Sequence, residues 1–280
     1  MTELARDPAM SSSAAYYRVP GLILLLAAAI VVAYPDSVAS MVGIWSTDGF
    51  RHSFLIPVIA GYLLWHDRER LVDAPLAPSW AGVVALLATV WLWLVARQAL
   101  IQVVEHLALL GMLHAAVLAV AGWHTYRKAA FALTYLVLAV PLGVESVPWL
   151  MELTAAIAGK GLVLIGMPNL REGMYFTLPG GSFEVAEACS GFRYVYSGLA
   201  LSSLIAYVTF SSWTRRIAFV LLAVTMFMLI NGIRAMLVMA IASASEMRYL
   251  AEDHVWFGWL LFFVALIGLH FAAVRFSDVR

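Results

Sequence analysis

Apolar runs of about 20 residues recur along the whole length of this chain, separated by short polar breaks. A helix of that length spans the ~30 Å hydrocarbon layer of a bilayer. The pattern therefore predicts an all-α polytopic membrane protein with about eight transmembrane helices. We place these segments near residues 17–34, 53–65, 80–97, 102–122, 129–147, 190–210, 217–244 and 254–274.

The composition favours the same class, because 63% of the residues are hydrophobic and only 12% are charged. Soluble domains average about 45–50% apolar and about 25% charged residues. The formal net charge is zero, so we expect no nucleic acid or other polyanionic partner. The continuous hydropathy favours a single transmembrane domain over residues 1–280.

Pairs of basic residues occupy alternate breaks between the apolar segments, and basic residues prefer the cytoplasmic side of a membrane. Five such pairs hold 10 of the 17 Lys and Arg residues. An even number of crossings with both termini in the cytoplasm fits this pattern. The pairs are Arg6 and Arg18, Arg68 and Arg70, Arg127 and Lys128, Arg215 and Arg216, and Arg275 and Arg280.

One long stretch, residues 148–188, spans no membrane in this scheme and is assigned to the outer side. Its first half, residues 151–166, is apolar but interrupted by charge, which suits a helix lying at the membrane interface. Its second half predicts a small β-hairpin, because Pro179, Gly180 and Gly181 supply a tight turn between two short alternating segments.

The single cysteine, Cys189, follows this hairpin and lies at the start of the sixth apolar segment. A lone cysteine in an apolar protein is most often a small inert hydrophobe. At a helix N-terminus, however, the unsatisfied N–H groups and the helix dipole favour the thiolate, which is the nucleophilic form. Ser190 and Gly191 beside it would let a substrate backbone approach closely.

Two more polar residues on the predicted outer side could act with this thiol. Arg234 lies within the seventh apolar segment, where a charge faces a cavity or a partner; one alternative is a structural ion pair with Glu105. His254 opens the last segment, where it could also be an ordinary interfacial residue. The predicted topology brings Cys189, Arg234 and His254 to one face, as thiol acyl transfer requires.

Metal chemistry receives little support from the sequence. His106 and His114 lie eight residues apart on one predicted helix, but no third ligand accompanies them. A single cysteine also excludes an internal disulfide and any C-x-x-C metal motif. We therefore expect neither a metal nor another cofactor.

Several segments, taken in order, resemble the exosortase and archaeosortase family of membrane cysteine transpeptidases. The resemblance covers roughly residues 48–271, and its specificity lies in the order and spacing of motifs that are individually weak. They are Phe50 to Pro57 with Leu63 to Trp65 and the Arg68 to Arg70 cluster, Pro141, Glu187 to Gly191, Asn231 to Arg234, and His254 with Phe257 to Trp259.

The resemblance implies that Cys189 forms an acyl-thioester and that Arg234 and His254 complete the catalytic set. It also implies substrates that are secreted proteins with a PEP-CTERM-like tail: a short Pro-Glu-Pro-like signal, a hydrophobic helix and a basic end. Membrane lipid would be a further partner. We expect the substrate-binding residues to be Glu187, Ser190, Gly191, Asn231 and His52.

The sequence thus predicts a cysteine transpeptidase or protease in the cytoplasmic membrane that cleaves sorting signals at its outer face. One alternative is a transporter or channel, because intramembrane Arg234, Glu105 and the histidines could line a pathway. Another is a non-catalytic assembly factor for exported polysaccharide, whose polar residues only join helices.

Overall fold

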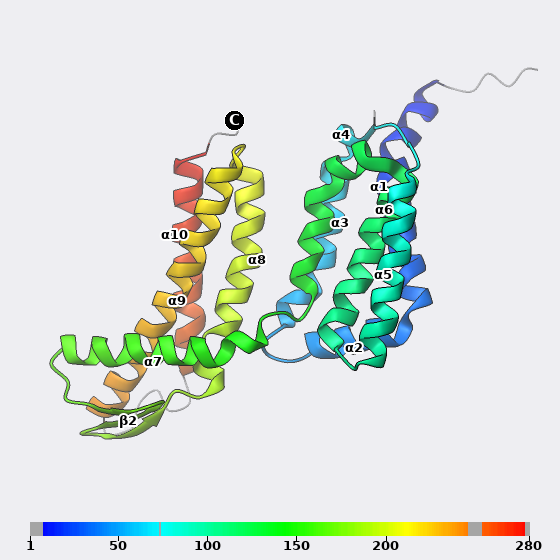
Figure 1. Cartoon of the computed structure of the whole chain (residues 1–280). Coiled ribbons are helices and arrows are strands. Elements are labelled where there is room, and N and C mark those ends of the chain that lie inside the picture. The colour runs from blue at the N-terminus through cyan, green and yellow to red at the C-terminus, as the bar shows by residue number, and fades with distance from the viewer. Residues whose placement is uncertain (1–7, 73, 246–253, 278–280) are drawn as a thin grey trace, which may run out of the picture. The chain divides into compact units, whose positions relative to one another are not determined.

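The computed structural model describes residues 8–72, 74–245 and 254–277, with side chains for 16–72, 74–245 and 258–277 (Figure 1). The chain forms two compact units, Met1–Leu142 and Gly143–Arg280. The prediction of a single domain over residues 1–280 stays a prediction.

The first unit is a bundle of helices joined by short turns. Its α6 contains a break at Gly122, where φ of 78° and ψ of 174° leave the helical region. A Cβ atom at that position would lie 2.0 Å from the carbonyl oxygen of Ala77, so glycine is required there. The elements are α1 (Pro8–Ala33), α2 (Pro35–Trp45), η1 (Arg51–Phe54), α3 (Leu55–His66), α4 (Arg68–Val72), α5 (Trp80–Gln98), α6 (Gln102–Tyr135) and η2 (Leu136–Ala139).

The second unit combines the helices α8, α9 and α10 with a small sheet and a transverse helix, α7. The predicted hairpin forms as β2 and β3, and β1, which was not predicted, pairs with β2 to give an antiparallel sheet of order β1-β2-β3. The elements are η3 (Val144–Ser146), α7 (Val147–Leu164), β1 (Leu170–Glu172), β2 (Tyr175–Leu178), β3 (Gly181–Glu184), η4 (Glu187–Cys189), α8 (Phe192–Thr209), α9 (Trp213–Ala244) and α10 (His254–Arg275).

The expected fold class, an all-α polytopic membrane protein, is confirmed. Over the described ranges, six helices are long and apolar enough to cross a membrane: α1, α5, α6 with η2, α7, α9 and α10. The break at Gly122 divides α6 into two arms. The first matches the predicted segment 102–122, but the second ends at Tyr135 and continues as η2 only to Ala139, so the predicted segment 129–147 extends too far, into η3 and α7. The shorter α3 and α8 stand alongside the long helices of their units (Figure 1). The predicted number of about eight is thus approximate, with six candidate spans among the described residues.

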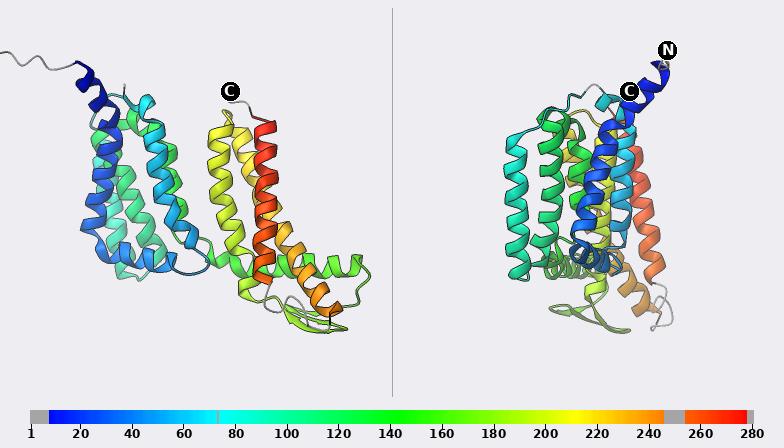
Figure 2. Two further views of the ribbon diagram at one scale, coloured as in Figure 1. Left: turned by 180° about the vertical axis from the view of Figure 1, so that it is seen from behind. Right: turned by 90° about the vertical axis from the view of Figure 1, so that its right-hand side faces the viewer.

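The orientation of α7 distinguishes it from the other long helices of its unit. It runs across α8, α9 and α10 rather than along them in both views (Figures 1 and 2). Apolar side chains at its end, Val163 and Leu164, are 66% and 86% exposed. A transverse helix with an exposed apolar surface is typical of a segment lying at a membrane interface.

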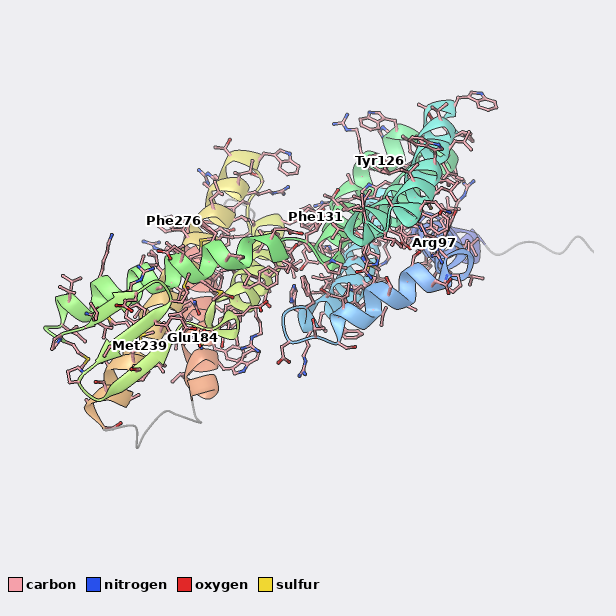
Figure 3. All side chains as sticks on the ribbon, turned by 60° about the horizontal axis from the view of Figure 1, so that its bottom comes forward. Arg97, Tyr126, Phe131, Glu184, Met239 and Phe276 are labelled. Atoms are coloured by element: carbon pink, nitrogen blue, oxygen red, sulfur yellow. The ribbon has the colours of Figure 1, made fainter. Side chains whose placement is uncertain are left out.

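The sheet is held on α7 and α9 by a buried apolar cluster. Phe176 of β2 is fully buried, and it packs with Leu162 of α7 and Met239 of α9. Met239 of α9 and Glu184 of β3 lie in the same region of this unit (Figure 3). A second cluster, which includes Tyr194, Phe227 and Phe262, joins α8, α9 and α10. The polypeptide between β3 and α8, which contains Cys189, is therefore supported on both sides.

Candidate active site

Cys189 is the last residue of η4, three residues before α8 begins. The Cys189 N–H donates to the carbonyl of Ala186 at 2.8 Å, which closes this short turn. Gly191, the residue directly before α8, has a φ of 80°. A Cβ at position 191 would lie 2.5 Å from Cγ of Asn231, so both the backbone conformation and the space require glycine.

Asn231 and Thr154 fasten this turn to the neighbouring helices. The Asn231 amide nitrogen of α9 donates to the carbonyl of Cys189 at 3.0 Å and to the hydroxyl of Thr154 at 2.9 Å. The Thr154 hydroxyl of α7 in turn donates to the carbonyl of Ser190 at 3.3 Å. Both side chains are 2% exposed, so these bonds lie away from water. Asn231 thus holds the backbone of Cys189 in place, and the substrate contact expected for it stays a prediction.

Replacing Thr154 with valine should destabilise the turn that carries Cys189. Valine has nearly the same shape but leaves the Ser190 carbonyl without its donor, which costs about 1–3 kcal/mol for a buried group. We expect a lower midpoint of thermal unfolding and slower alkylation of Cys189 by iodoacetamide. Thr154→Ser retains the hydroxyl and should behave much more like the wild type. Equal behaviour of Thr154→Val and wild type would contradict this role.

Arg234 is almost fully enclosed, with only 5% of its surface exposed. Its guanidinium lies over the ring of Tyr194, 5.6 Å from the centroid, and its Nε atom has no hydrogen-bond partner within the described residues. A glycine at position 258 lets α10 approach closely, because a Cβ there would lie 2.4 Å from the Tyr194 hydroxyl and 3.2 Å from an Arg234 nitrogen. A desolvated guanidinium of this kind is suited to binding an anion.

The alternative partner considered for Arg234, Glu105, is engaged elsewhere. One guanidinium nitrogen of Arg97 lies 3.4 Å from a carboxylate oxygen of Glu105, and the other lies 3.0 Å from Asp36. These three residues belong to α6, α5 and α2 and join the helices of the first unit. Within the described part of the chain, no carboxylate forms an ion pair with Arg234.

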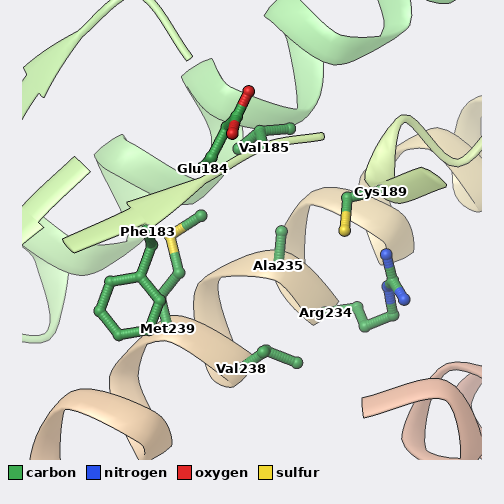
Figure 4. Close-up of a pocket in the computed structure, with 8 residues that line it drawn as sticks. All are labelled: Phe183, Glu184, Val185, Cys189, Arg234, Ala235, Val238 and Met239. Carbon is green, nitrogen blue, oxygen red and sulfur yellow. The ribbon is translucent and has the colours of Figure 1, made fainter. Parts of the chain in front are cut away.

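Cys189 and Arg234 open onto the same cavity, between β3 and α9 (Figure 4). The sulfur and the guanidinium point toward one another in the close-up. The cavity has a volume of about 70 Å³, and most of its surface is apolar. Its lining residues are Phe183, Glu184, Val185, Cys189, Arg234, Ala235, Val238 and Met239. The structure thus brings together two of the three predicted catalytic residues.

The third, His254, is the first residue of α10, and its side chain lies outside the described residues. Position 254 precedes Gly258 by four residues, so the two positions share one face of the helix. Gly258 is the point at which α10 meets Arg234 and Tyr194. The helix backbone therefore brings position 254 to the side of α10 that approaches the arginine.

The remaining predicted substrate-binding residues differ in their surroundings. Glu187 is exposed on η4, whereas Ser190 is 3% exposed and its hydroxyl accepts a hydrogen bond from the Phe192 N–H at 3.3 Å. His52 belongs to η1 in the first unit, and burial lowers its pKa to about 4. The imidazole of His52 is therefore neutral near pH 7.

Sequence reasoning missed three residues around the site. Thr154 is a neutral residue in an apolar run, and such a residue gives little indication of a functional role. Tyr194 and Arg193 follow Cys189 closely in the chain, and the Arg193 guanidinium lies 5.3 Å from the Tyr194 ring centroid. The Tyr194 ring thus has two cations near it. As for metals, the described residues contain no group of three His, Cys, Asp or Glu side chains placed to hold an ion.

Comparison with known proteins gives one finding. The family model described as "Transmembrane exosortase (Exosortase_EpsH)" matches residues 44–271, well over half of the chain and parts of both units. No curated protein and no solved structure matches the chain.

Proposed function

The chain belongs to the transmembrane exosortase family, and on that premise we propose that it is a cysteine transpeptidase that cleaves C-terminal sorting signals of secreted proteins. The observation that carries the proposal is the cavity shared by the Cys189 sulfur and the buried Arg234 guanidinium. A nucleophile beside an arginine that lacks a carboxylate partner in the described structure supplies both an attacking atom and a site for developing negative charge.

In the proposed reaction, the Cys189 thiolate attacks the carbonyl carbon of the scissile peptide bond and forms a C–S bond. The carbonyl oxygen becomes an oxyanion, which the Arg234 guanidinium stabilises. The C–N bond then breaks, the leaving nitrogen takes a proton from His254, and a thioester remains on Cys189. Water or an amine next attacks the thioester carbonyl carbon, and the proton that this nucleophile loses passes to the neutral His254 imidazole. The C–S bond then breaks and releases the Cys189 thiolate.

The division of labour between Arg234 and His254 follows from their acidities. A guanidinium holds its proton too tightly to be an easy donor, whereas an imidazole exchanges protons near neutral pH. We therefore assign oxyanion stabilisation to Arg234 and proton transfer to His254. The opposite assignment, with Arg234 as the proton donor, is the alternative.

The proposed substrates are secreted proteins with a PEP-CTERM-like signal, a single hydrophobic helix and a basic end, and membrane lipid surrounds both partners. Such a tail inserts with its basic end in the cytoplasm, because positive residues stay inside. The recognition signal then emerges at the outer interface, the depth expected for Cys189. The transverse α7 and the sheet packed on it suit that interface.

This orientation predicts the result of a labelling experiment. Both termini and residues 66–79, 123–128 and 211–216 should lie in the cytoplasm, and residues 148–188 and 246–253 outside, because the basic pairs alternate. Single cysteines introduced into a Cys189→Ala background would be labelled with a membrane-impermeant maleimide in intact cells. Protection of a cysteine at position 184 until the cells are opened would refute the orientation.

The chemical proposal is tested by trapping the thioester. The probe is a secreted reporter that ends in a Pro-Glu-Pro signal, a hydrophobic helix and a basic segment. Hydroxylamine added to membranes during turnover should release the reporter with a hydroxamate end, because a thioester reacts readily with this amine. Mass spectrometry detects the product. Cleavage at the normal rate after Cys189 has been alkylated would exclude the covalent route.

A further inference from the structure

β3 is an edge strand of the three-stranded sheet, since only β2 pairs with it. The Val185 N–H donates to the carbonyl of Met174 at 2.9 Å, so position 185 faces β2. Backbone groups alternate in direction along a strand, so positions 183 and 181 also face β2, and Ser182 and Glu184 face away. In the described part of the structure, no other strand takes up these outward N–H and C=O groups.

The cavity beside Cys189 follows this same edge. Phe183 points toward α9 and Glu184 points to the opposite side of the sheet (Figure 4). Both Phe183 and Glu184 nevertheless line the cavity. Because their side chains lie on opposite faces of β3, the cavity runs along the unpaired edge of the strand and not under one face. Val238 and Met239 of α9 form the other wall. The space is therefore bounded by an unpaired strand edge and an apolar helix surface.

The direction of β3 leads toward Cys189 and Arg234. The strand runs from Gly181 to Glu184, and the chain then reaches Cys189 within five residues. Cys189 and Arg234 lie at this end of the cavity (Figure 4). A peptide laid along the edge in the same direction as β3 would carry its carboxyl end to the sulfur and the guanidinium.

We propose that the substrate segment preceding the scissile bond binds as a parallel fourth strand on the edge of β3. Its backbone pairs with the outward groups of Ser182 and Glu184, as in other cases of peptide recognition by strand addition. Its last side chain enters the cavity, whose volume of about 70 Å³ and apolar lining suit a small aliphatic group. This inference rests on the proposed function and names how the substrate is held.

Proline substitutions test the pairing directly. Ser182→Pro and Glu184→Pro each remove one outward N–H, and prolines are tolerated on edge strands when that N–H is not used by the sheet. We expect KM for the reporter to rise about three- to tenfold per removed N–H, with kcat retained. Ser182→Ala and Glu184→Ala keep the N–H groups and should lose much less affinity. An unchanged KM in both proline variants would overturn the proposal.

Two further measurements distinguish loss of strand pairing from misfolding of the variant and from failure of the proposed enzyme function. Alkylation of Cys189 by iodoacetamide at the wild-type rate shows that a proline variant retains the folded site. If Cys189→Ala still processes the reporter, the enzyme proposal itself has failed. If Cys189→Ala is inactive while folded proline variants bind normally, only the strand pairing has failed.

A crosslinking scan gives an answer that does not depend on the proline variants. Glu184→Cys in a Cys189→Ala background would be oxidised with reporters carrying single cysteines at successive positions before the scissile bond. An added strand presents alternate side chains to the same face, so we expect crosslinks at every second position. Equal crosslinking at all positions, or none at any, would overturn the proposal.

Discussion

Cys189→Ala should abolish processing of the reporter while the protein still accumulates in the membrane. The expected loss is at least about 10³-fold, because removing a catalytic nucleophile costs factors of this size or more. No other cysteine can replace it, since Cys189 is the only one in the chain. Its side chain is only partly buried, and the neighbouring hydrogen bonds use its backbone carbonyl, so folding should be little affected. Immunoblots of cleaved and uncleaved reporter would measure the effect.

Two companion variants sharpen this experiment. Cys189→Ser should bind the tail yet turn over poorly, because an alcohol needs a stronger base than an imidazole to become a nucleophile. Ala188→Ser is a similarly small substitution at the exposed residue next to Cys189, and this variant should process the reporter normally. Normal processing by Cys189→Ala would leave a transporter or an assembly factor as the better explanation of the polar residues.

Arg234→Lys should reduce kcat/KM about 10²- to 10³-fold, even though the positive charge is kept. Removing one preformed oxyanion donor costs this much in well-studied enzymes. Lysine offers a compact charge instead of a planar fork, and it cannot stack on Tyr194 in the same way, where the guanidinium lies 5.6 Å from the ring centroid. The measurement is the rate of reporter cleavage at limiting substrate in detergent-solubilised enzyme.

A matched control exists on the same helix. Arg215→Lys makes the same change near the start of α9, far along the helix from the cavity, and should leave the cleavage rate unchanged. Arg234→Met provides a second contrast: it removes a buried charge, which often leaves stability equal or higher, while activity is lost. Full activity in Arg234→Met would show that the guanidinium has no part in the reaction.

The elements that could be predicted from the sequence are those with a strong local signal. Pro179 to Gly181 predicted the β2-β3 turn correctly, because these residues favour the tight turn whatever surrounds them. The three-residue β1 was missed, because a strand of that length has too few residues to show alternation. The two arms of α6 were predicted as separate segments, and the break between them lies at Gly122.

In the candidate site, contacts between residues far apart in the sequence were harder to predict than local elements. Cys189 and Arg234 were predicted to converge, and the structure places both on one cavity. The link from Asn231 to Thr154 joins residues 77 positions apart. Such a bond depends on how α7 and α9 pack, which apolar runs alone do not specify. For that reason the bond from Asn231 to the Cys189 carbonyl could not be predicted from the sequence.

Asn231 and Arg234 lie three residues apart on α9, so one helix holds the backbone of Cys189 and also carries the cation beside it. Bilayers of different thickness tilt transmembrane helices to match their hydrophobic length. A tilt of α9 moves both groups together, because neighbouring turns of a helix behave as a rigid body. We therefore expect lipid composition to change the depth of Cys189 and Arg234 in the membrane more than the spacing between the Cys189 backbone and the guanidinium.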